Sequence, residues 1–325
     1  MGISQEQALD CFNSDDLIGI GMEADAVRRR LHPEGVVSYV LDRTLCYPVA
    51  GFEAPGFDLF DLQLAEAEAL GASGLTLRCA LEPEMSIDAM TAMLAGIRGR
   101  FPSLWLHGLS ATEVVAIATR SGSTIRETLE RLQEAGLQSL SGSDAGVLDY
   151  SAHAPSAVAA MTRCSIAEWI EVHRTAHRIA LPTMAAMRFG AGETMDQRMN
   201  HLEAVRQLQE ETGGFIAFVL ATFQPAATGS RNFEEPTAVE YLNTLAISRM
   251  VLDTIVNVQA DWGMQGLKVL QMALRFGAND VGSTMPGKCI VPADGTTEED
   301  LRRVIRGAGF RPVERDTVYR TMFLD

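Results

Sequence analysis

Acidic, basic and imidazole side chains that can exchange protons or bind polar ligands follow short apolar runs throughout the sequence. The predicted catalytic groups are His107, Asp42, Asp144 and Glu193, because an imidazole and carboxylates can act as general acids or bases. A second set can hold a polar aromatic ligand through hydrogen bonds, ion pairs and stacking. This predicted substrate-binding set consists of Arg43, Arg78, Ser141, Gln259, Asp261, Trp262 and Asp280.

Several of these residues also have a structural interpretation. Glu193 begins a helical segment, where a carboxylate commonly stabilises the helix N-terminus. Arg78 can fill a pocket without binding a ligand, and Trp262 can be a core aromatic. His107 can be a hydrogen-bonded histidine at the end of a strand. Asp42 can clamp a ligand together with its neighbour Arg43, or the two can simply pair with each other.

Cysteine and histidine spacing predicts no metal site. The five cysteines stand at positions 11, 46, 79, 164 and 289, and the sequence has no Cys-x2-Cys or His-x3-His pair. An odd, scattered set favours reduced thiols, as in cytoplasmic proteins. Cys79 beside Arg78 is either a reactive thiolate or an inert buried thiol, and the second is commoner.

The composition excludes some partners. A net charge of −15 argues against binding nucleic acid, which needs clustered Lys and Arg. Met1–Asp16 is polar and acidic, and every apolar run is far shorter than a membrane span. We therefore expect a cytoplasmic protein with a small-molecule substrate and no membrane partner.

Strand-length apolar runs alternate with helix-period segments along almost the whole chain. Eight such units predict an α/β fold, a (β/α)8 TIM-type barrel, as a single domain over residues 1–325. It would have a helical N-terminal extension at 1–35, the barrel at 36–295 and a C-terminal helix and tail at 296–325. A doubly wound open sheet is the alternative. The expected strands are Val36–Leu41, Leu75–Arg78, Leu104–His107, Gln138–Leu140, Thr183–Met187, Phe215–Val219, Asn257–Gln259 and Asp280–Gly282.

A barrel of this type carries its chemistry at the carboxyl ends of the strands. The strand bounds place all of the predicted site residues at these ends. Asp42 would follow the first strand, His107 would end the third, and Asp280 would lie at the last. We therefore expect the whole set around one mouth.

Several ordered segments resemble those of one enzyme family. The sequence is similar to the radical-SAM enzymes dehypoxanthinyl futalosine cyclase, aminofutalosine synthase and FO synthase, over about Glu6 to Tyr319. The resemblance implies a barrel of the radical-SAM kind and a link to the futalosine pathway of menaquinone biosynthesis. The segments that carry it are Val37–Arg43, Leu106–Ser110, Arg174–His177, Glu211–Phe215, Phe223–Pro225, Gln259–Trp262 and Leu274–Asp280.

The sequence departs from that family where its cofactors bind. The family holds a [4Fe–4S] cluster with a Cys-x3-Cys-x2-Cys loop after the first strand, whereas Thr44–Glu53 contains only Cys46. The family's Gln-Gly-Gly after the second strand is replaced by Arg78-Cys79-Ala80, which fills space where the family binds S-adenosylmethionine. The glutamate after strand four and the histidine after strand five are lost in Ser141–Gly146 and Gly190–Thr194. We expect no resident cofactor, no cluster and no metal, and S-adenosylmethionine binding is disfavoured.

Three functions fit this pattern. The leading hypothesis is a non-radical enzyme that acts on a futalosine-like nucleoside or a related polar aromatic metabolite. The second is a non-catalytic partner or regulator of an intact radical-SAM relative, and the third is a non-radical S-adenosylmethionine-binding protein. The sequence leaves a homodimer open.

Overall fold

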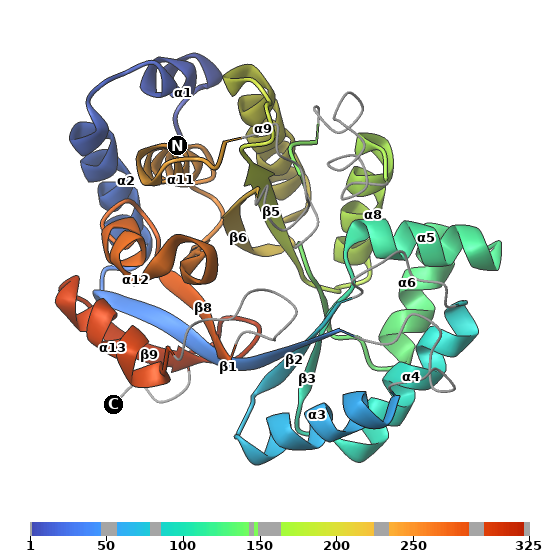
Figure 1. The fold of residues 1–325 in the computed structure, drawn as a ribbon. Coiled ribbons are helices and arrows are strands. Elements are labelled where there is room, and N and C mark those ends of the chain that lie inside the picture. Colours follow the sequence, from blue (N-terminus) through green and yellow to red (C-terminus); the bar gives the residue numbers. More distant parts are fainter. Residues whose placement is uncertain are drawn as a thin grey trace.

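Eight parallel strands close into a barrel in the computed structural model, which describes residues 2–46, 57–78, 86–142, 146–148, 164–223, 234–285 and 296–321. Strand β1 pairs with β8 on one side and with β2 on the other, so the sheet has no free edge between them (Figure 1). This confirms the predicted (β/α)8 barrel and excludes the open sheet. The strands are β1 (Val36–Cys46), β2 (Gly74–Arg78), β3 (Trp105–Gly108), β4 (Ser139–Leu140), β5 (Thr183–Phe189), β6 (Phe215–Thr222), β7 (Asn257–Ala260) and β8 (Asp280–Met285).

Helices surround the barrel, and most of them begin at a Ser, Thr or Asp cap. In α8, for example, the Ser165 hydroxyl accepts from the Glu168 backbone N–H while the Glu168 carboxylate accepts from Ser165, which satisfies amide donors of the first turn. No helix among the described residues is long and apolar enough to cross a membrane. The outer helices are α3 (Phe57–Ala69), α4 (Ile87–Arg100), α5 (Ala111–Ser121), α6 (Ile125–Glu134), α8 (Ile166–Arg178), α9 (Met195–Thr212), α11 (Ala238–Val251), α12 (Trp262–Ala273) and α13 (Glu298–Gly307).

The N-terminal extension forms two helices, α1 (Gln5–Phe12) and α2 (Leu17–Leu31), which pack beside α11 (Figure 1). Close packing of α2 requires a small residue. A Cβ atom on Gly21 would lie 2.7 Å from the ring of Phe276, closer than any real contact, so the glycine lets the helix approach the barrel.

A ninth strand differs from the predicted C-terminal tail. β9 (Arg311–Arg315) pairs in parallel with Val36–Val40, the first half of β1. Its sequence, Arg-Pro-Val-Glu-Arg, has one strong strand former and a proline, so it lacks the alternation that predicts a strand. The strand forms because β1 offers backbone partners outside the closed barrel.

Two further strand bounds differ from the prediction and change where site residues lie. β1 continues to Cys46, so Asp42 and Arg43 lie within the strand. β8 begins at Asp280 and runs to Met285, so Asp280 lies at the amino end of its strand. The expectation that Asp280 sits at the carboxyl mouth is therefore wrong.

Candidate functional site

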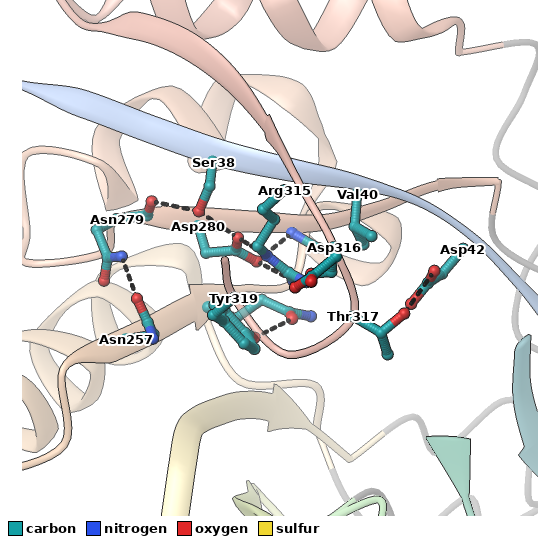
Figure 2. Close-up of polar contacts among 12 residues, drawn as sticks. Ser38, Val40, Asp42, Asn257, Asn279, Asp280, Arg315, Asp316, Thr317 and Tyr319 are labelled. Atoms are coloured by element: carbon teal, nitrogen blue, oxygen red, sulfur yellow. Dashed lines mark hydrogen bonds and ion pairs between the residues drawn. The ribbon is translucent and has the colours of Figure 1, made fainter. Parts of the chain in front are cut away.

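The amino end of the barrel lumen is occupied by the last residue of β9, Arg315, and by residues that follow it. Arg315 is buried and donates to both carboxylate oxygens of Asp280, at 2.5 and 2.8 Å. The Asp280 carboxylate also accepts from the Ser38 hydroxyl at 2.6 Å and from the backbone N–H of Gly282 at 2.8 Å. The Arg315 guanidinium lies 3.6 Å from the centre of the Tyr319 ring. Figure 2 shows this group, in which the Arg315 guanidinium faces the Asp280 carboxylate.

Asp42 connects this group at the amino end, the floor of the lumen, to the neighbouring strands. Its carboxylate accepts from the hydroxyls of Thr317 at 3.0 Å and Ser73 at 3.1 Å (Figure 2). A Cβ atom at Gly74 would lie 2.2 Å from the Thr317 hydroxyl and 2.8 Å from Asp42, so only glycine leaves room for these bonds. Burial raises the pKa of Asp42 to about 6, although Arg315 and the two hydroxyls oppose that rise. Asp42 is therefore a lumen carboxyl that titrates near neutral pH.

His107 lies further up the lumen, above the level of Asp42. The strand register places Asp42 beside Gly74, and His107 beside Thr76 two residues further along β2. Its Nδ1 lies 2.7 Å from the hydroxyl oxygen of Ser139. Burial, followed by the positive charge of Arg315, lowers the pKa of His107 to about 4. The imidazole is therefore neutral at pH 7 and can act there as a proton acceptor or hydrogen-bond partner, not as a cation.

Gln259 belongs to the same lower part of the lumen. Its amide oxygen accepts from the Tyr319 hydroxyl at 3.2 Å. Its amide would collide with a Cβ atom on Gly282 of the neighbouring strand. The structure thus joins Gln259 to the floor. No sequence pattern pointed to Arg315, Thr317 or Tyr319 as site residues, since they lie more than 30 residues beyond the last predicted barrel strand.

The carboxyl end of the lumen carries a different group. Arg78 ends β2, Arg188 is the sixth residue of β5, and Asp261 follows β7 as the N-cap of α12. Burial raises the pKa of Asp261, while the backbone amide of Met264 and the charges of Arg188 and Arg78 oppose the rise. Both guanidinium groups are therefore close enough to Asp261 to act on its carboxylate.

Trp262 and Ser141 are buried residues at the carboxyl end of the lumen. The Trp262 indole N–H donates to the carbonyl of Ser283 at 3.2 Å, which ties the start of α12 to β8. The Ser141 backbone N–H contacts the carbonyl oxygens of Gly108 and Leu109, at the end of β3. Leu109 has a φ of 55°, a left-handed conformation that is uncommon for leucine and typical of constrained positions next to functional sites.

Two predicted site residues point to the outer helices. Arg43 lies 3.2 Å from the carboxylate of Glu66 on α3, and it pairs with that residue instead of with its neighbour Asp42. Glu193 accepts from the backbone N–H groups of Gly190 and Ala191 and from Arg198 on α9, at 2.7 to 2.9 Å. Its carboxylate thus fastens the loop between β5 and α9, which is the structural alternative foreseen for it.

Asp144 and Cys79 lie outside the described residues.

Two histidines of α8 lie between that helix and the barrel. His173 and His177 both contact the Thr183 hydroxyl, at 2.9 and 2.8 Å, and pack against the Phe215 ring. Burial lowers the pKa of His173 to about 3 and that of His177 to about 4. These histidines hold α8 against the barrel in neutral form.

The described cysteines do not form a metal-binding set. Cys46 ends β1, Cys164 precedes α8 with its sulfur 3.6 Å from the Thr112 hydroxyl, and Cys11 lies on α1. Within the described ranges, no three His, Cys, Asp or Glu side chains are grouped so that they could hold a metal ion. Cys289, like Cys79, is outside those ranges.

Solved structures with this architecture define the class of protein. Methylornithine synthase (PylB) superposes with a TM-score of 0.70 at 12% identity, covering 96% of this chain and 94% of that one. The FeFe-hydrogenase maturase HydG from Carboxydothermus hydrogenoformans gives 0.70 at 12% identity, covering 98% and 78%. At such identity the likeness concerns the fold alone, which is the TIM barrel of the radical-SAM kind.

Sequence relatives then give the family. The cyclic dehypoxanthine futalosine synthases of Halalkalibacterium halodurans and Streptomyces coelicolor are each 32% identical over 98% of this chain, and the matches cover 90% and 85% of those proteins. The 5-amino-6-(D-ribitylamino)uracil–L-tyrosine 4-hydroxyphenyl transferase of Archaeoglobus fulgidus is 32% identical over 92% of both chains. The family model "CofH/MqnC C-terminal region" matches residues 212–324. The chain belongs to the CofH/MqnC family, which confirms the resemblance in the sequence.

The residues at the end of β1 do not fit the iron–sulfur cluster that this fold family implies. Three thiolates are needed after β1, and Thr44–Glu53 supplies one, Cys46. Cys46 also forms part of β1, where it pairs with Arg78. This segment therefore lacks the three thiolate donors that the cluster needs.

Proposed function

We propose that this chain is a non-radical member of its family, an enzyme that binds a nucleoside-like or other polar aromatic metabolite in the barrel lumen. One combination of observations carries the proposal. Thr44–Glu53 contains a single thiol, Cys46, while charged side chains lie at the carboxyl end of the lumen. Without three thiolates the chain has no means to start one-electron chemistry. Proton transfer by lumen side chains is then the remaining chemistry.

Asp42 is the proton-transfer group that we propose. Its pKa of about 6 lets it hold or release a proton at neutral pH, and the hydroxyls of Thr317 and Ser73 fix its orientation. His107, two residues further up the lumen, would form a hydrogen bond with the ligand as a neutral imidazole. Trp262 and Ser141 would frame the ligand at the mouth.

Iron analysis and ligand binding test the two parts of this proposal. Protein purified without oxygen should contain far less than one iron per chain and show no visible absorption. About four irons and four sulfides per chain, bleached by dithionite, would contradict the non-radical function. Thermal-shift screening with adenosine and related nucleosides should reveal stabilisation, and its absence for every nucleoside would count against the substrate class.

A non-catalytic partner of an intact relative is the second candidate. The observation in its favour is that Asp42 and His107 are both buried and already bonded to protein hydroxyls. Co-purification with a cluster-bearing homologue would support it. A stable homodimer that binds nucleosides alone would contradict it. Isothermal titration with S-adenosylmethionine separates the third candidate, since that function requires a heat of binding.

A further inference from the structure

The His107 side chain is on the inner face of the barrel wall. On β2 that face is marked by Gly74, where a Cβ atom would meet the lumen carboxylate of Asp42. Side chains on a strand alternate between faces, so Thr76 shares the inner face, and the register aligns His107 of β3 with Thr76. The charge of Arg315, which is in the lumen, also acts on His107. The small part of His107 that is exposed, 4%, therefore opens onto the lumen.

Trp105 and Ser139 form a hydrogen-bonded chain with this imidazole. The Trp105 indole N–H donates to the Ser139 hydroxyl oxygen at 2.9 Å. An indole nitrogen can only donate, so the direction of this bond is fixed. The same oxygen lies 2.7 Å from His107 Nδ1. Ser139 is fully buried, so its own hydroxyl hydrogen needs an acceptor inside the protein.

The hydroxyl hydrogen of Ser139 then fixes the tautomer of His107. Within the part of the chain that the structure describes, His107 Nδ1 is the only acceptor bonded to this hydroxyl. The O–H therefore donates to Nδ1, which carries no hydrogen of its own. Burial, followed by the charge of Arg315, lowers the pKa of His107 to about 4, so the ring is neutral at pH 7. The single N–H of the neutral ring is then at Nε2.

The Nε2–H group of His107 has no acceptor among the described residues, where the bond to Ser139 is the one hydrogen bond of this imidazole. His177 of α8 shows the contrast. Its two ring nitrogens are both bonded to protein hydroxyls, those of Thr212 at 2.6 Å and Thr183 at 2.8 Å. The outer imidazole is thus used up by the fold, whereas the inner one is held at Nδ1 and leaves a donor at the tip of the ring, on the lumen side.

We propose that the Nε2–H group of His107 binds an uncharged acceptor of the ligand, a carbonyl oxygen or a ring nitrogen, and that Ser139 and Trp105 are positioning residues that hold the ring in this tautomer. This inference deepens the proposed function, on whose ligand-binding lumen it rests. A neutral imidazole that donates can polarise a carbonyl without adding a charge to the site. Asp42 lies two residues lower, about 7 Å along the strands. The ligand would thus carry its acceptor above the atom that exchanges a proton with Asp42.

Nitrogen NMR of protein labelled at the histidine nitrogens measures the tautomer directly. The ring signals that are missing from His107→Gln belong to His107, and at pH 7 they should show a protonated Nε2 and an unprotonated Nδ1. Ser139→Ala removes the hydroxyl that fixes this state, so His107 should become a mixture of both tautomers. The matched control is Ser248→Ala, which should leave the signals unchanged. It removes another fully buried serine hydroxyl, one bonded to the Thr244 carbonyl of α11.

Nucleoside binding then tests the donor. The probes are inosine, which carries a ring carbonyl, and adenosine, which offers ring nitrogens, each titrated by calorimetry at pH 7. His107→Leu should weaken the tighter of the two by about three- to tenfold, the effect of one neutral hydrogen bond. His107→Gln should keep most of the affinity, because its amide N–H can reach the position of Nε2, and Ser248→Ala should bind like the wild type. Circular dichroism verifies that each variant is folded.

An Nδ1–H tautomer in the wild-type protein, or undiminished affinity for both nucleosides in His107→Leu, would overturn the inference. An unchanged tautomer in Ser139→Ala would reject the positioning role of that hydroxyl. Nucleoside binding by a protein with an Nδ1–H ring would reject the inference but leave the proposed function standing. Cluster-loaded protein would reject the non-radical function while leaving the tautomer measurable. Failure of both nucleosides to bind would count against both.

Discussion

The two ends of the lumen use charge in opposite ways. At the amino end, Arg315 faces Asp280 and the polar groups have partners within the protein (Figure 2). At the carboxyl end, the charges of Arg188 and Arg78 act on the buried carboxylate of Asp261, which caps α12. The floor is bonded within the protein, whereas the mouth is the end at which a barrel of this kind binds its ligand. The comparison predicts that substitutions at the floor change stability and that substitutions at the mouth change binding.

Replacing Arg315 should have the largest effect. Arg315→Met leaves the buried Asp280 carboxylate without its cation, which typically costs about 3–5 kcal/mol. Urea denaturation at pH 7 measures this loss. The exposed pair of Arg320 and Asp316 is the control, and Arg320→Met should cost less than about 1 kcal/mol. Similar losses in the two variants would show that the floor is not a structural element.

Acid should destabilise the protein partly through His107. Its pKa is lower in the folded chain, at about 4, than the ordinary 6.5, so its contribution to stability is complete above 6.5 and is lost as the pH falls toward 4. The difference corresponds to about 3 kcal/mol. Denaturation curves of His107→Gln should therefore lose less stability than wild type between pH 7 and pH 4. Parallel profiles for the two proteins would argue against a buried neutral imidazole.

The titration of Asp42 should change the stability of the protein in the opposite direction, with a gain toward low pH. Its folded pKa of about 6 exceeds the ordinary 3.8, so the folded state is favoured below pH 4 and loses that advantage as the pH rises through 6. Asp42→Asn removes this titration, and the variant should gain on wild type by about 2–3 kcal/mol between pH 4 and pH 7. Carbon NMR of the carboxyl group gives the pKa directly. A value near 4 would remove Asp42 as the proton-transfer group.

The smallest effect on stability is expected at the mouth. Arg188→Met alters a half-buried residue at the carboxyl end of β5 and should change the free energy of unfolding less than Arg315→Met does. The same substitution should weaken nucleoside binding in the thermal-shift screen. A loss comparable to that of Arg315→Met would mean that Arg188 is a structural residue, and the contrast between the two ends would then disappear.

Helices and strands could be predicted closely because their signals are local. The helix Met195–Thr212 illustrates this, since Thr194 caps it with Gln197 and Gly213 ends it in the left-handed conformation. The depth of Asp42 in the lumen could not be predicted, because it depends on how far β1 extends and on the register of β1 with β2. Alternation alone does not reveal that register.

Sequence patterns could not predict the floor of the lumen for a different reason. Asp280 and Arg315 are 35 residues apart, and β9 lacks the alternation of a strand. Arg188 could have been found, since Phe189 beside it packs outward under Arg198 of α9, which implies an inward arginine. Glu193 was given its correct structural alternative, a carboxylate that fastens the start of a helix.

The position of β9 in the chain has a consequence for biosynthesis. The ribosome releases all eight barrel strands before Arg311–Thr321 emerges, so a nascent barrel would briefly expose Asp280 to water at one open end. The Asp280 carboxylate can pair with Arg315 only after Arg315 has been translated. Domains commonly fold as units during synthesis, and here a short, late segment decides when the unit is finished.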